Sequence, residues 1–118
     1  MARILVADGA RVIRQVAALL VTSLQHDVVA EASTAQEAVA AAVRFEPDVV
    51  LIDVELLGSE PGESLARFAE VRPQARVVAC ASLRQKEDLR RAIAAGARAG
   101  VLRPFVRSQL AEALLGVL

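Results

Sequence analysis

Five short apolar segments recur along this chain, and helix-forming stretches separate them. The segments span residues 3–7, 27–32, 48–53, 75–81 and 99–102. Strands that are covered on both faces appear in a sequence as unbroken apolar runs, whereas strands with one wet face alternate apolar and polar residues. Buried strands that alternate with helices predict an α/β fold, in which a doubly wound parallel sheet is covered by helices on both faces.

The stretches between the strands carry the spacing and the end signals of helices. We expect helices at 10–24, 33–45, 63–72, 84–96 and 108–118, and a loop at 54–62. Ser33 and Gln36 have the spacing of a capping box at the start of the second helix, and Pro47 follows its end. No linker or low-complexity tract divides the chain, so residues 1–118 are predicted to form one domain.

Composition excludes several classes of protein. Hydrophobic residues make up 55% of the chain but aromatic residues only 3%, so the core is predicted to be aliphatic. Fourteen basic residues balance fourteen acidic ones, whereas a general binder of nucleic acid or anionic membranes has a basic excess. The single cysteine, Cys80, fits a reducing compartment, and no apolar stretch reaches the roughly 20 residues of a membrane span. We therefore expect a small soluble domain of the cytoplasm.

Two predicted strands end in an acidic residue. Asp8 follows the first strand, and Asp53 ends the third. Burying an unpaired carboxylate is costly, so an acid that interrupts an apolar run is expected at a solvated strand end or in a site that uses its charge. In open α/β sheets the functional crevice lies at the carboxyl ends of the strands, where the strand order reverses. If the first and third strands are neighbours, Asp8 and Asp53 face each other across that crevice.

Three motifs, RILVAD (3–8), PDVVLID (47–53) and AGARAGVLRPF (95–105), resemble in order and spacing the receiver domain of two-component response regulators. The resemblance extends over nearly the whole chain. It implies a flavodoxin-like (βα)5 fold with strand order 2-1-3-4-5. It also implies that Asp53 is the phosphoacceptor for a histidine kinase, that Mg²⁺ assists the transfer, and that Arg103 stands where the family has a lysine.

The metal site implied by this resemblance departs from the family pattern. Receivers carry two adjacent acids after the first strand, and here the pair reads Asp8-Gly9. Asp8, Asp53 and the main-chain carbonyl of Glu55 remain as Mg²⁺ ligands, and the Glu55 side chain offers a further carboxylate. Because Mg²⁺ demands near-octahedral oxygen ligation, we expect the loss of the second acid to leave a weak site.

The residues that contact and report the phosphoryl group also differ from the family. Counted from Gly96, the hydroxyl at the end of the fourth strand falls on Ala81, although Ser82 is adjacent and a shift of one residue would restore it. Arg103 keeps the charge of the family lysine, but its guanidinium is planar and forked rather than compact. Gly100 stands where the family has an aromatic residue. The resemblance thus implies a preserved fold with an eroded switch.

Two functions follow from this pattern, and a third is less favoured. The chain is either a receiver that is phosphorylated on Asp53 or a pseudo-receiver, an interaction module that works without phosphoryl transfer. A small nucleotide- or flavin-binding domain lacks support, because neither G-x-G-x-x-G nor G-x-x-x-x-G-K-[ST] is present. The single histidine, His26, has no nucleophile to activate, so the chain is not expected to be an enzyme.

The resemblance also implies protein partners. A histidine kinase or another signalling protein is the expected partner, and a homodimer would form through the face made by segments 84–96, 99–102 and 108–118. Direct contact with nucleic acid or a membrane is not expected from a chain of zero formal net charge. Affinity for a divalent metal separates the two leading functions, because only phosphoryl transfer requires the metal.

Overall fold

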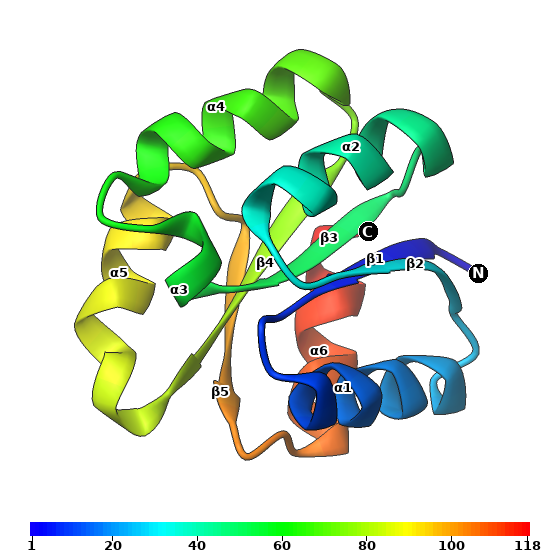
Figure 1. The fold of residues 1–118 in the computed structure, drawn as a ribbon. Helices are drawn as coiled ribbons and strands as arrows, with labels where there is room; N and C mark the ends of the chain where they lie inside the picture. The colour runs from blue at the N-terminus through cyan, green and yellow to red at the C-terminus, as the bar shows by residue number, and fades with distance from the viewer.

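The computed structural model describes residues 1–118 and shows a parallel sheet in the order β2-β1-β3-β4-β5 with helices on both faces (Figure 1). The predicted fold class and strand order are confirmed. In chain order the elements are β1 (Arg3–Ala7), α1 (Arg11–Ser23), β2 (Asp27–Ala32), α2 (Ala35–Phe45), β3 (Val49–Asp53), α3 (Val54–Leu57), α4 (Pro61–Val71), β4 (Arg76–Ser82), the 3₁₀ turn η1 (Leu83–Gln85), α5 (Lys86–Ala94), β5 (Ala99–Arg103) and α6 (Arg107–Val117).

The core consists of two aliphatic layers, one on each face of the sheet. The layer under α1 and α6 contains Ile4 and Leu114, and the layer under α2, α4 and α5 contains Leu5 and Phe68 (Figure 1). Adjacent residues of one strand are therefore both buried, which explains the unbroken apolar runs. Cys80 lies in the first layer, where burial raises the pKa of its thiol. None of the helices is both long and apolar enough to cross a membrane.

The predicted loop at 54–62 is wrong in its first half. Val54–Leu57 form α3 directly after β3, and the Val54 and Leu57 side chains are buried in the core. Tertiary burial of these side chains stabilises a helix that is too short to be stable alone. α4 then begins at Pro61 rather than at residue 63, because the missing N–H of proline needs no partner in the first turn of a helix.

The predicted capping box of the second helix is displaced by one residue. Thr34, not Ser33, is the N-cap of α2, and its hydroxyl accepts a hydrogen bond from the Glu37 N–H at 3.1 Å. The Glu37 carboxylate in turn accepts one from the Ser33 N–H at 3.0 Å. A carboxylate in the first turn also interacts favourably with the positive end of the helix dipole, which Gln36 cannot match.

The strand order indicates where along the sheet a functional site is expected. β1 lies between β2 and β3, so the chain connections reverse direction there, and ligands bind outside the carboxyl ends of strands at such points. Ala7 pairs with Ile52 in the register of β1 and β3. The residues that follow them, Asp8 and Asp53, are therefore neighbours at the carboxyl ends of these strands.

Candidate functional site

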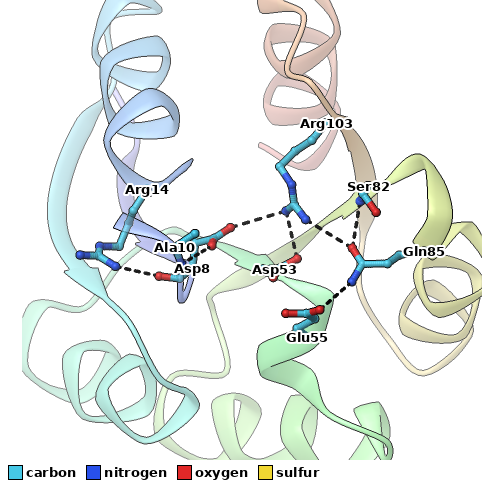
Figure 2. A network of polar contacts seen from close by, with 8 residues as sticks. All are labelled: Asp8, Ala10, Arg14, Asp53, Glu55, Ser82, Gln85 and Arg103. Carbon is cyan, nitrogen blue, oxygen red and sulfur yellow. Dashed lines mark hydrogen bonds and ion pairs between the residues drawn. The ribbon is translucent and has the colours of Figure 1, made fainter. Parts of the chain in front are cut away.

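A crevice with a volume of about 480 Å³ opens at the carboxyl ends of the strands. Here "the crevice" means the cavity lined by Asp8 and Gly9 after β1, Asp53 and Glu55 around the end of β3, Ser82, Arg84 and Gln85 after β4, and Arg103 at the end of β5, together with Ala10, Ile13 and Leu56. The candidate site residues Asp8, Asp53, Glu55, Ser82 and Arg103 therefore line one cavity. Figure 2 shows the polar contacts among these residues.

Arg103 lies between the two acids that the sequence predicted to meet. Its Nη1 donates to Asp53 Oδ1 at 3.0 Å and lies 3.5 Å from Asp8 Oδ2 (Figure 2). The exposed fractions of these side chains are only 15% for Arg103, 6% for Asp53 and 9% for Asp8. Solvent therefore screens the ion pairs poorly, and the guanidinium is the principal compensation for two buried negative charges.

Asp8 has a structural role in addition to its place in the crevice. Its Oδ1 accepts a hydrogen bond from the Ala10 N–H at 2.9 Å, which fixes the turn that leads into α1. Arg14 donates to the main-chain oxygen of Asp8 at 2.9 Å. Burial raises the pKa of the Asp8 carboxyl, and the charge of Asp53 adds to this effect against the opposing influence of Ala10, Arg103 and Arg14.

This pKa shift predicts a dependence of stability on pH. The pKa of Asp8 is raised above its ordinary value of 3.8, so the protonated carboxyl stabilises the folded state relative to the unfolded chain. This stabilisation is fully present below pH 3.8 and is lost as pH rises through the folded-state pKa. Asp8→Asn keeps an acceptor for Ala10 and does not ionise. We expect the variant to gain stability relative to the natural chain as pH rises, as measured by urea unfolding from pH 4 to pH 7. A variant that loses relative stability over this range would contradict the prediction.

Gln85 connects the crevice to the start of α5. Its Oε1 accepts hydrogen bonds from the Ser82 N–H at 3.0 Å and from Arg103 Nη2 at 3.3 Å. Its Nε2 donates to Glu55 Oε1 at 3.3 Å. The Glu55 side chain therefore turns toward Gln85 (Figure 2).

The predicted Mg²⁺ ligands Asp8, Asp53 and Glu55 do not form a cluster of three metal-binding side chains. Two carboxylates and a main-chain carbonyl are oxygen donors of the kind that Mg²⁺ prefers, but Arg103 already pairs with both carboxylates. The residues present fit a weakly held ion, and Mg²⁺ binding stays a prediction.

The structure separates Ala81 from Ser82. The Ala81 side chain is fully buried in the layer under α2, α4 and α5. Ser82 pairs with Arg103 in the register of β4 and β5 and carries the only hydroxyl among the residues that line the crevice. If a hydroxyl contacts the phosphoryl group in this chain, Ser82 is the residue that supplies it.

At Gly100, where the family has an aromatic residue, the space beside the backbone is filled by the side chain of another residue. A β-carbon on Gly100 would lie 2.8 Å from Leu89 Cδ1 and 3.0 Å from Leu89 Cγ. Leu89 is a partly buried residue of α5 that packs against the core. The space next to the Gly100 backbone is therefore occupied from α5, and a side chain at residue 100 would require Leu89 to shift.

Sequence analysis missed Gln85 and Leu89. Both lie in the segment RQKEDL (84–89), in which the polar residues are typical of the solvated start of a helix. One signal for Gln85 was present, because Ser82 and Gln85 have the S-x-x-Q spacing of a capping box. No signal marks Leu89, because its contact with Gly100 depends on how α5 lies against β5.

Comparisons with known proteins identify the family. The family model "Response regulator receiver domain" matches residues 4–115. The chain is 28% identical to the chemotaxis protein CheY of Thermotoga maritima, over 95% of this chain and 93% of that protein. It is 31% identical to the chemotaxis protein CheY of Listeria monocytogenes, over 97% of this chain and 96% of that protein.

Solved structures show the same fold. The REC domain of AraT, a response regulator from Geobacillus stearothermophilus, matches with a TM-score of 0.84 at 22% identity, over 98% of this chain and 92% of that one. A LuxR-family two-component response regulator from Aurantimonas matches with a TM-score of 0.85 at 25% identity, over 99% of this chain and 84% of that one. Because the family model matches nearly the whole length of this chain, the chain belongs to the response regulator receiver domain family.

Proposed function

We propose that this chain is a two-component receiver in which Asp53 is the phosphoacceptor and phosphorylation is slow. The observation that carries the proposal is the meeting of Asp53, Asp8 and Arg103 in one crevice at the carboxyl ends of parallel strands. Asp53 supplies a carboxylate nucleophile, Arg103 supplies a fixed positive charge beside it, and the cavity leaves room for a phosphoryl group.

The transfer follows from this geometry. Asp53 Oδ1 accepts a hydrogen bond from Arg103, so we assign Oδ2, which has no hydrogen-bond partner, as the attacking oxygen. Oδ2 forms a bond to phosphorus while the bond between phosphorus and the donor breaks, and the electron pair of that bond leaves with the donor. Arg103 then offsets part of the charge added to the site. Mg²⁺, if held by Asp8, Asp53 and the carbonyl of Glu55, would neutralise charge on the incoming group.

Two features of the crevice support slow phosphorylation. Gly9 provides no carboxylate where the family has its second acid, so the crevice has fewer charges with which to hold a divalent cation. Arg103 pairs with Asp8 and Asp53 at once and competes with such a cation for the same oxygens. A divalent cation that binds these oxygens must therefore displace Arg103 from part of its ion pairs.

Incubation with acetyl phosphate and excess magnesium, followed by intact-mass measurement, tests the proposal. We expect slow and partial addition of one phosphoryl group, and no addition to Asp53→Asn. Asp88→Asn, which removes a solvent-exposed carboxylate from α5, is the matched control and should behave as the natural chain. Rapid and nearly complete modification at low magnesium would refute the slow-receiver proposal.

A second candidate function, the phosphorylation-independent pseudo-receiver, is favoured by one specific observation. Gly100 has no side chain where the family has an aromatic residue, and Leu89 packs against the backbone there, so the family's aromatic read-out is missing from this chain. If no phosphoryl group is added and partner binding is unchanged in Asp53→Asn, the chain acts as an interaction module.

Several further assignments belong to this proposal. A histidine kinase or another signalling protein is the proposed partner, because the curated relatives include chemotaxis proteins. A homodimer would use the face of α5, β5 and α6, where a groove runs along Gly100 and Leu102.

A cytoplasmic location fits the free thiol of Cys80. The chain would act as a phosphoryl acceptor with no catalytic turnover of its own.

A further inference from the structure

We propose that Gln85 is a positioning residue that passes a change at Asp53 to α5, in a chain where Ala81 and Gly100 stand at the positions of the family's hydroxyl and aromatic ring. The proposal rests on the proposed function in one respect, that Asp53 is the group whose charge changes. Four observations on the crevice and its surroundings support it.

The first observation is that Ala81 and Gly100 carry neither the hydroxyl nor the ring that the family has at these positions. Ala81 presents a methyl group inside the core and makes no polar contact with the crevice. At Gly100 the Leu89 side chain occupies the space next to the backbone. Neither residue 81 nor residue 100 therefore offers a side chain that could carry a signal from Asp53 to the elements beyond β4.

The second observation is the position of Gln85 in the chain. It is the last residue of η1 and the N-cap of α5, so its backbone sets where α5 begins. Its side chain does not point to solvent but lies over the crevice (Figure 2). A single residue thus belongs both to the crevice and to the helix that follows it.

The third observation is that Gln85 uses both ends of its amide. Oε1 accepts from the Ser82 N–H and from Arg103 Nη2, and Nε2 donates to Glu55. These contacts tie the end of β4, the end of β5 and α3 to one side chain. Release of any one of them changes the partners left for the others.

The fourth observation is the rigid connection to Asp53. Arg103 contacts Asp53 through Nη1 and Gln85 through Nη2. Because a guanidinium is planar and its nitrogens keep fixed relative positions, a movement of Nη1 toward or away from Asp53 also moves Nη2. A change of charge at Asp53 therefore reaches Gln85 through one rigid group, and Gln85 carries it to the first turn of α5.

The experiment measures amide chemical shifts by ¹H–¹⁵N NMR in four proteins: the natural chain, Asp53→Asn, Gln85→Leu and the double variant. This design needs no phosphoryl donor, so it can fail while Asp53 is still phosphorylated, and it can succeed if Asp53 is not. We expect Asp53→Asn to shift the amides of 82–90, and we expect most of this shift to be lost when Gln85 is leucine. Gln109→Leu, an exposed glutamine on α6, is the matched control and should leave the response intact.

Two further measurements keep the test decisive. Exchange of the Ser82 amide hydrogen should speed up in Gln85→Leu, because that amide loses its acceptor. Gln85→Glu keeps the acceptor for Ser82 and Arg103 but loses the donor to Glu55, so it tests the acceptor contacts separately, and these should retain the response of α5. An unchanged response in Gln85→Leu, or no response of α5 to Asp53→Asn in the natural chain, would overturn the proposal.

Discussion

Arg103→Met is expected to lower the free energy of unfolding by about 3 to 5 kcal/mol at neutral pH, the range seen when one partner of a buried ion pair is removed. Methionine retains much of the side-chain volume but leaves Asp8 and Asp53 without a cation, and both carboxylates are less than one-tenth exposed. Urea unfolding followed by circular dichroism gives the measurement.

Two comparisons show whether the loss comes from charge. Arg90→Met removes an exposed arginine that pairs only with Glu87 on the surface of α5, and it should change stability by less than about 1 kcal/mol. Asp53→Asn combined with Arg103→Met should be more stable than Arg103→Met alone, because one uncompensated charge is gone. If Arg103→Met and Arg90→Met lose equal stability, Arg103 does not compensate the acids.

Gly9→Asp is expected to raise the rate of phosphorylation by acetyl phosphate about tenfold or more, since a tenfold gain in metal affinity corresponds to only about 1.4 kcal/mol. A β-carbon at residue 9 would meet its nearest neighbour, the Ser33 carbonyl oxygen, at an ordinary distance of 3.7 Å. The β-carbon of the new residue therefore meets no clash, and the added carboxylate raises the negative charge available for a divalent cation.

The rate is measured as phosphoryl addition over time by intact mass, at several magnesium concentrations. Gly116→Asp adds the same charge near the end of α6, where a β-carbon meets nothing, and serves as the matched control. The gain should disappear when Asp53→Asn is added to Gly9→Asp. An unchanged rate in Gly9→Asp would show that the missing acid does not limit the reaction.

Much of the fold followed from the sequence because its signals are local. Strands buried on both faces require continuous apolar runs, and all five predicted runs coincide with strands. α3 was missed because a helix of four residues is too short to show a period. The cap at Thr34 was misplaced because Ser33 and Thr34 are both good N-caps, and only the contact with Glu37 decides between them.

The site was predictable where topology alone brings residues together. Asp8, Asp53 and Arg103 end neighbouring or nearby parallel strands, so strand order is enough to place them at one edge. Gln85 and Leu89 could not be found in this way. Their partners are set by how far a side chain reaches across the gap between α5 and β5, and a single sequence contains no record of that distance.

The packing of Leu89 against Gly100 also limits how this receiver can change during evolution. A bulky residue at position 100 must displace Leu89, because even its β-carbon would overlap that side chain. A smaller residue at position 89 would leave a void beside the core until position 100 changes as well. Each single step toward an aromatic switch therefore costs stability before the second step can restore it. The two positions are therefore sterically coupled, so an aromatic residue at position 100 is better tolerated together with a smaller residue at position 89.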